Sequence, residues 1–153
     1  MLTLTKKTEY ALIAVAYLAE RAGQSCSARQ ISAEYELPLP VLMNILKTMN
    51  HSGLVISTRG AKGGYRIGED PANISLARLI DAVEGPIRFV ACVGKNDADC
   101  CIGDCPIRKP VLRLHQKLNE FLEKTTLAEI VSGRNGIGDE LPVSSEAVPG
   151  AAT

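Results

Sequence analysis

Four of the five cysteines in this 153-residue chain fall within one short stretch. They are spaced C-x7-C-C-x3-C, at Cys92, Cys100, Cys101 and Cys105. Most residues between them are glycine, asparagine or aspartate, which favour turns over helices and strands. A loop with so few apolar residues cannot be ordered by core burial, so we expect bound metal to order it. Clustered cysteines in a reducing compartment indicate metal or redox chemistry, and disulfides are the less favoured alternative.

The spacing alone leaves three kinds of site open. Zinc prefers four Cys or His ligands in pairs such as C-x2-C, and adjacent cysteines rarely bind one zinc ion together. An iron–sulfur cluster, [2Fe–2S] or [4Fe–4S], tolerates looser spacing because its ligands bind different irons. A thiol switch needs neighbouring cysteines and no metal. The fifth cysteine, Cys26, lies too far along the chain to be assigned to the same site.

Composition and charge restrict the class of protein. No apolar run is long enough to span a membrane and the first residues lack a secretory signal, so we expect a cytosolic protein with no membrane partner. The formal net charge is zero, but residues 1–67 carry eight Lys and Arg against four Asp and Glu, whereas residues 68–153 carry nine against thirteen. This polarity favours phosphate binding by the front half. No catalytic triad, phosphate loop or paired acid and base is evident, so we do not expect an enzyme.

The front half predicts a helix-turn-helix. A helical pattern over residues 5–21 precedes a short helix that begins after Ser27, whose spacing to Gln30 is that of a capping box. A Pro-containing turn leads to a second short helix that ends at Gly53, and its apolar residues are expected to form a buried stripe: Leu42, Ile45, Leu46 and Met49. Two helices joined by a tight turn, the second with small polar and basic outward residues, are typical of DNA readers. The candidate DNA-contacting residues here are Arg29, Pro40, Val41, Asn44, Lys47 and Thr48.

The next segment predicts a β-hairpin wing. Short strands at residues 54–57 and 65–67 flank the glycine-rich sequence STRGAKGG, whose tip can approach a DNA groove closely. We expect Arg59 and Lys62 to lie in or against the minor groove and Lys47 to contact phosphate. Gly63, Gly64 and Tyr65 complete the candidate DNA-binding set.

The rest of the chain predicts one long helix and a tail. A helix capped by Ser75 ends at Gly85, and a helix running to about Lys124 carries a coiled-coil-like seam that favours a partner subunit. The seam residues are Val111, Leu114, Leu118 and Phe121. We therefore predict a mainly α fold with a small β-hairpin wing, divided into four parts: a winged helix-turn-helix domain (1–85), a cysteine loop (86–105), a dimerisation helix with a short helix (106–131) and a flexible tail (132–153).

These features resemble the Rrf2 family of bacterial transcription regulators, of the IscR/NsrR type. The resemblance covers residues 4–131, and its most specific part is the RGxxGGYxI motif at Arg59–Ile67. It implies a winged-helix homodimer that binds palindromic double-stranded DNA operators. Many members of the family bind an iron–sulfur cluster that tunes DNA affinity in response to redox state, nitric oxide or iron–sulfur status, and some members lack the cluster. An alternative function of a different class remains open. The chain would then be a small iron–sulfur or zinc protein whose winged helix contacts other proteins rather than a specific DNA sequence.

The resemblance also implies a ligand set. Cys92 and Cys105 match the family's first and third cysteines, and the middle ligand is Cys100 or Cys101, with Cys100 preferred. Where IscR members have a histidine, this chain has Arg108. NsrR-like members use a carboxylate from the other subunit, and the matching residue is Glu9. His115, on the long helix, and His51, at the end of the recognition helix, are expected to be surface residues rather than ligands.

Overall fold

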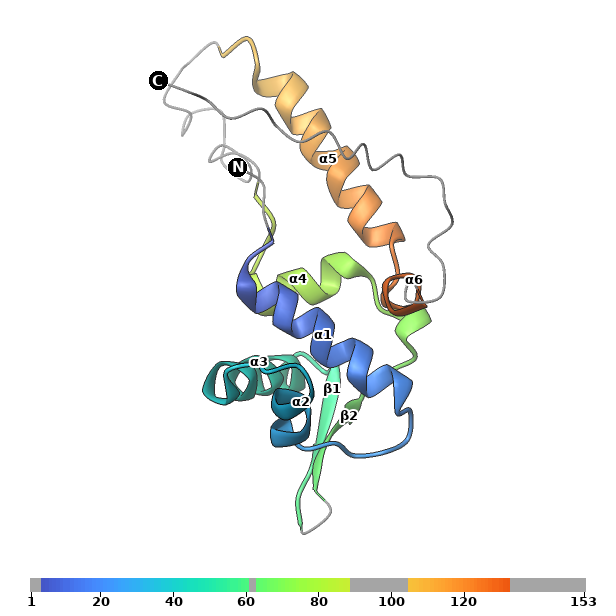
Figure 1. Ribbon diagram of the computed structural model, residues 1–153. Helices are drawn as coiled ribbons and strands as arrows, with labels where there is room; N and C mark the ends of the chain where they lie inside the picture. Colours follow the sequence, from blue (N-terminus) through green and yellow to red (C-terminus); the bar gives the residue numbers. More distant parts are fainter. Residues whose placement is uncertain (1–3, 61–62, 89–104, 133–153) are drawn as a thin grey trace, which may run out of the picture.

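The computed structural model of the chain describes residues 4–60, 63–88 and 105–132. In chain order its elements are α1 (Lys6–Glu20), α2 (Ala28–Glu34), α3 (Leu39–His51), β1 (Val55–Thr58), β2 (Gly64–Ile67), η1 (Pro71–Asn73), α4 (Leu76–Glu84), α5 (Arg108–Lys124) and α6 (Leu127–Ser132). The predicted fold class, mainly α with a small hairpin, is confirmed. In Figure 1 α1 and α4 lie between the helix-turn-helix and α5, the hairpin extends below, and α5 extends to the opposite side.

Local capping explains where several helices begin. Ser27 and Gln30 form the predicted reciprocal capping box at the start of α2. The Ser75 hydroxyl accepts a hydrogen bond from the Arg78 N–H, as expected for the cap of α4. At α6, Thr126 and Glu129 exchange the same pair of bonds as the first box. The Ser27 box and the Ser75 cap were therefore predicted correctly from sequence.

The core joins the helix-turn-helix to the end of the chain. The predicted inward stripe of α3 (Leu42, Ile45, Leu46 and Met49) is buried. Leu127 of α6 belongs to the same core cluster, and two 2.8 Å backbone hydrogen bonds hold it there, from Leu76 N–H to the Thr125 carbonyl and from Leu127 N–H to the Ile74 carbonyl. After the long helix the chain thus returns to the body that carries the recognition helix.

The hairpin differs by one residue from the prediction at three of its four strand ends. β1 and β2 are antiparallel, with Val55 opposite Ile67 and Thr58 opposite Gly64.

Within the described ranges, none of the helices combines the length and apolar character needed to cross a bilayer.

Candidate nucleic-acid interface

The outward face of α3 is exposed while its inward face is fixed in the core. Pro40, Val41, Asn44, Lys47 and Thr48 are all exposed, as the helical period predicted. The Thr48 hydroxyl donates to the Asn44 carbonyl at 3.0 Å, which leaves its oxygen lone pairs available as acceptors. The face therefore presents small polar groups and one cation to solvent, the side chains that suit base edges and phosphate.

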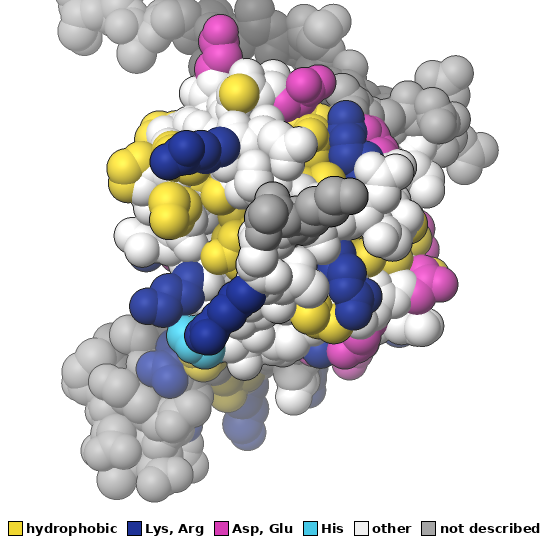
Figure 2. All heavy atoms as spheres, turned by 90° about the horizontal axis from the view of Figure 1, so that it is seen from below, with side chains coloured by type: hydrophobic (Ala, Val, Ile, Leu, Met, Phe, Trp, Pro, Cys, Tyr) yellow, Lys and Arg dark blue, Asp and Glu magenta, His cyan; other side chains and the backbone are white. Residues whose placement is uncertain are grey.

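The wing is bonded to the end of this helix. Asn50 accepts a hydrogen bond from the Ser57 N–H through its side-chain oxygen at 2.9 Å, so the end of α3 is linked directly to β1. Arg59 follows β1 directly and is exposed, as is Arg29 on α2. Lys62 lies outside the described residues. Figure 2 shows this side of the molecule from below, with Lys and Arg side chains distributed over it and most acidic side chains toward its edge.

The glycines of the wing have a structural role that the sequence did not reveal. Cys26 and Tyr65 form an isolated antiparallel bridge with hydrogen bonds of 2.8 and 2.7 Å. A Cβ at Gly64 would lie 2.5 Å from the Cys26 carbonyl oxygen, and one at Gly63 would lie 2.5 Å from that of Thr58. The Tyr65 side chain packs partly against the core. Contact of Gly63, Gly64 and Tyr65 with DNA stays a prediction.

Cys26 itself is buried, 4% exposed, inside the main core cluster. A thiol in that position behaves as a small apolar side chain. The burial of Cys26 in the core agrees with the prediction that this residue is not part of the cysteine site.

Of the predicted metal ligands, the structure describes two. Cys105 is a partly exposed free thiol just before α5. Glu9, in the first turn of α1, accepts a hydrogen bond from Lys6 at 2.6 Å. This hydrogen bond raises the pKa of Lys6. Because exposed ion pairs contribute little free energy, Lys6 does not prevent Glu9 from binding a metal. Cys92, Cys100 and Cys101 lie outside the described residues, and within those described no group of three or more His, Cys, Asp or Glu could hold a metal ion.

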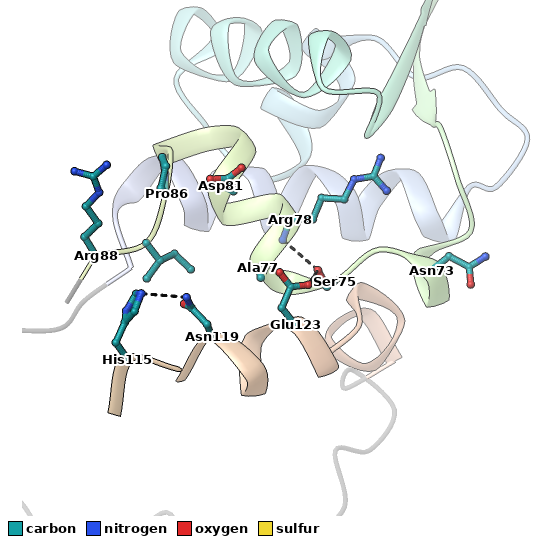
Figure 3. Close-up of a pocket in the computed structure, with 11 residues that line it drawn as sticks. Asn73, Ser75, Ala77, Arg78, Asp81, Pro86, Arg88, His115, Asn119 and Glu123 are labelled. Carbon is teal, nitrogen blue, oxygen red and sulfur yellow. Dashed lines mark hydrogen bonds between the residues drawn. The ribbon is translucent and has the colours of Figure 1, made fainter. Parts of the chain in front are cut away.

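The expectation that His115 lies on the surface is wrong. Its side chain is 9% exposed and shares a 3.2 Å hydrogen bond with the Asn119 side chain. Both residues line a cavity of about 820 Å³ between α4 and α5. In Figure 3 they face the segment after α4, and Arg88 points away from them. His115 is buried because α5 packs on α4, a contact that the helical pattern of α5 alone does not reveal. His51 is exposed, as predicted.

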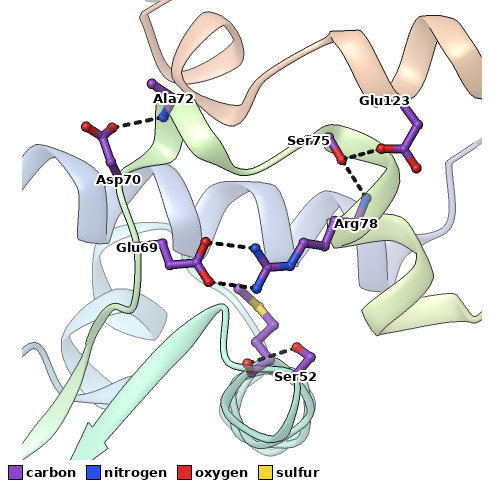
Figure 4. A network of polar contacts seen from close by, with 8 residues as sticks. Ser52, Glu69, Asp70, Ala72, Ser75, Arg78 and Glu123 are labelled. Atoms are coloured by element: carbon purple, nitrogen blue, oxygen red, sulfur yellow. Dashed lines mark hydrogen bonds and ion pairs between the residues drawn. The ribbon is translucent and has the colours of Figure 1, made fainter.

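Polar contacts also connect the wing to the long helix (Figure 4). Glu69, just after β2, accepts two hydrogen bonds of 2.8 Å from the Arg78 guanidinium on α4. This bidentate contact lowers the pKa of Glu69 and raises that of Arg78. The Ser75 hydroxyl, which caps α4, donates to Glu123 of α5 at 3.1 Å. The base of the wing, α4 and α5 are thus joined through short polar links.

A helix-turn-helix with its outward face free and a wing bonded to it defines a winged-helix DNA-binding protein. The family model described as "Iron-dependent Transcriptional regulator" matches residues 4–133. The chain therefore belongs to the Rrf2 family, as the motifs in its sequence indicated. The curated relatives are transcriptional regulators rather than enzymes, in agreement with the absence of a recognisable catalytic motif.

Two relatives and one solved structure illustrate the similarity. The chain is 31% identical over 142 residues to the HTH-type transcriptional regulator NsrR of Bacillus subtilis, covering 88% of this chain and 93% of that one. It is 33% identical over 131 residues to IscR of Vibrio vulnificus, covering 84% and 77%. The structure of CymR, the global cysteine regulator of B. subtilis, superposes with a TM-score of 0.68 at 28% identity, covering 87% of this chain and 98% of that one.

Proposed function

We propose that this protein is a homodimeric transcription regulator of the cytosol that binds palindromic operators with its two recognition helices in successive major grooves. The observation that carries the proposal is the exposed face of α3, fixed from behind by a buried stripe and from the side by the Asn50–Ser57 bond. Half-sites should lie about 10–11 bp apart, or a multiple of that. Lys47 would contact phosphate, and Arg59 and Lys62 the minor groove.

An apolar groove supports the homodimer. The start of α1, the end of α4 and the second half of α5 line a cavity of about 480 Å³ that includes Leu4, Ile80, Leu118 and Phe121. On α5, Leu114 is 53% exposed and Phe121 is 64% exposed. An exposed apolar groove with large exposed apolar side chains on the same helix is typical of an interaction site. The regular seam on α5 suits the same helix from a second copy.

The dimer is tested by placing a charge in the seam. Phe121→Glu should convert a species of twice the 16.4 kDa chain mass into monomers. Gln116→Glu, which places the same charge on the opposite side of α5, is the matched control and should remain dimeric. Sedimentation equilibrium reports both masses. A wild-type protein that is monomeric at the concentrations used for DNA binding would contradict the proposal.

We further infer that an iron–sulfur cluster tunes DNA affinity. The donors would be Cys92, Cys105 and one of Cys100 and Cys101, with Glu9 from the partner subunit as the fourth. When bound, the cluster would supply one-electron redox chemistry and a centre that small oxidants can attack. The partly exposed Cys105 thiol and the accessible Glu9 carboxylate suit this role. A carboxylate is a harder donor than a thiolate, so the iron it binds would be the most easily lost.

Anaerobic spectra test the cluster. Protein purified without oxygen should be brown, and its thiolate-to-iron absorption should vanish in Cys92→Ala and Cys105→Ala. Single replacement of Cys100 or of Cys101 separates the ligand from the bystander. A colourless protein with stoichiometric zinc would establish a zinc site instead, and a colourless protein without metal would indicate a thiol switch.

A mixed dimer tests whether Glu9 acts across the interface. When a Glu9→Ala subunit pairs with a Cys92→Ala subunit, ligation in trans places both lesions on one site and leaves one intact cluster. Ligation within one subunit would damage both clusters. Wild-type cluster content in the Glu9→Ala homodimer would show that Glu9 is not a ligand.

A further inference from the structure

One carboxylate joins the end of α4 to the beginning of α1. Glu84, the last residue of α4, accepts hydrogen bonds from the hydroxyls of Thr5 and Thr8 on the same oxygen, the latter at 3.2 Å. Thr5 is the N-cap of α1, and its hydroxyl oxygen accepts a hydrogen bond from the Thr8 N–H at 3.4 Å. Thr8 is only 1% exposed, so its hydroxyl depends on a protein partner. The negative charge of Glu84 also lies at the positive end of the α1 dipole, where it is favourable.

This contact lies where three parts of the molecule meet. After Glu84 the chain turns at Gly85, which has a φ of +87°, and continues through Pro86 toward the cysteine loop. Thr8 and Glu84 also line the apolar groove assigned above to the dimer interface. The first turn of α1, which Glu84 holds, carries Glu9. The end of α4 therefore connects the loop, the interface and the start of α1.

The same two helix ends reach the recognition helix. Lys7 of α1 and Val83 of α4, the direct neighbours of Thr8 and Glu84, line a cavity of about 320 Å³ together with Val41, Asn44 and Thr48 of α3. Those three α3 residues belong to the predicted DNA-reading face. Since α1 also packs directly on α3 and α4, a shift between the ends of α1 and α4 would displace that face of α3.

We propose that Glu84 is a positioning residue that transmits the state of the cysteine loop to the recognition helix through Thr5 and Thr8. The inference rests on the proposed function, because it presupposes that the loop controls DNA affinity. When the hydrogen bonds from Thr5 and Thr8 to Glu84 are intact, movement of the chain after α4 carries the start of α1 with it. When both bonds are absent, the loop and α1 move independently, and the position of α3 no longer depends on the state of the loop.

The measured quantity is the ratio of operator dissociation constants between cluster-free and cluster-loaded homodimers. Coupling between two sites commonly corresponds to about a 5–150-fold change in affinity, and we expect the wild-type ratio, in either direction, to fall in this range. Glu84→Ala, which removes both bonds, should bring the ratio to within about twofold of one, and Thr8→Val, which leaves the bond from Thr5, should reduce the ratio part of the way. The double variant should do no more than Glu84→Ala alone, because Glu84→Ala already removes the bond from Thr8.

Conservative variants and a distant pair control for general damage. Glu84→Gln and Thr8→Ser keep an acceptor and a hydroxyl, so both should retain the wild-type ratio. Glu69→Ala removes another carboxylate contact to α4, the one to Arg78, and should also leave the ratio unchanged. If Glu69→Ala lowered the ratio as much as Glu84→Ala, the cause would be a general loosening of α4, and the proposal would be overturned.

Failure of this inference is separable from failure of the proposed function. A large wild-type ratio that survives in both Glu84→Ala and Thr8→Val would overturn the role of Glu84 and leave cluster-dependent DNA binding intact. A wild-type ratio of one would overturn both. A collapsed ratio in Glu84→Ala with recovery in Glu84→Gln would support the proposal.

Discussion

Gly64 distinguishes a structural role of the wing glycines from a role in contacting DNA. In Gly64→Ala the new Cβ would lie 2.5 Å from the carbonyl oxygen and 2.6 Å from the carbonyl carbon of Cys26, well inside the 3.4 Å at which ordinary contact begins. The obstructing atoms are backbone, so no side-chain rotation can relieve the overlap. The segment at Cys26, just before α2, must therefore move away from strand β2.

Separation costs the two hydrogen bonds between Cys26 and Tyr65. At about 0.5–1.5 kcal/mol each, their loss amounts to about 1–3 kcal/mol of unfolding free energy. For a chain of this size, each kcal/mol lowers the unfolding temperature by about 2–4 °C. We therefore expect Gly64→Ala to unfold about 4–8 °C below the wild type for a mid-range loss of 2 kcal/mol.

Differential scanning calorimetry without DNA measures this effect, and Ser57→Ala, an exposed position on the facing strand opposite Tyr65, is the control. The control should unfold within about 1 °C of the wild type, because surface changes usually alter stability little. If Gly64→Ala unfolded at the wild-type temperature but failed to bind operator, the close approach to Cys26 would not be the reason for this glycine. Access to the DNA groove would then be the better explanation.

Three other changes test the DNA interface and the polar links. Lys47→Ala should weaken binding to all sequences and reduce the slope of log affinity against log salt by about one, as measured by fluorescence anisotropy at several salt concentrations. Arg59→Ala should cost more, chiefly at AT-rich positions, and equal affinities of variant and parent would contradict its placement in the minor groove. Arg78 lowers the pKa of Glu69, so this contact should stabilise the fold above the ordinary value of 4.5 and lose its effect as pH falls through the lowered pKa. The difference in unfolding temperature between the wild type and Glu69→Gln should accordingly be present at neutral pH and disappear in acid.

Local features of the fold could be predicted from sequence because their causes are local. The capping box of Ser27 and Gln30 acts over three residues, and the inward stripe of α3 follows the helical period. The RGxxGGYxI motif identified the family from a few residues. The wing, the recognition helix and the order of the elements were therefore predictable.

Features that depend on distant partners were not predictable from such patterns. Thr8 and Glu84 are 76 positions apart, and nothing in either local sequence indicates that they share a hydrogen bond. The burial of His115 likewise depends on the packing of α5 against α4. The role of Gly64 could be inferred only once the backbone of Cys26 was known to pass beside it. In each case tertiary packing, rather than periodicity or turn preference, decides the outcome.

Selection of binding sites from random duplex DNA is the most direct test of the proposed regulator. The wild-type homodimer should enrich a two-fold symmetric site whose half-site centres lie about 10–11 bp apart, or a multiple of that. The same selection with Asn44→Ala should lose sequence preference within the half-sites while keeping their spacing, because Asn44 lies on the exposed face of the recognition helix. Enrichment of no symmetric sequence by the wild-type protein would contradict the account.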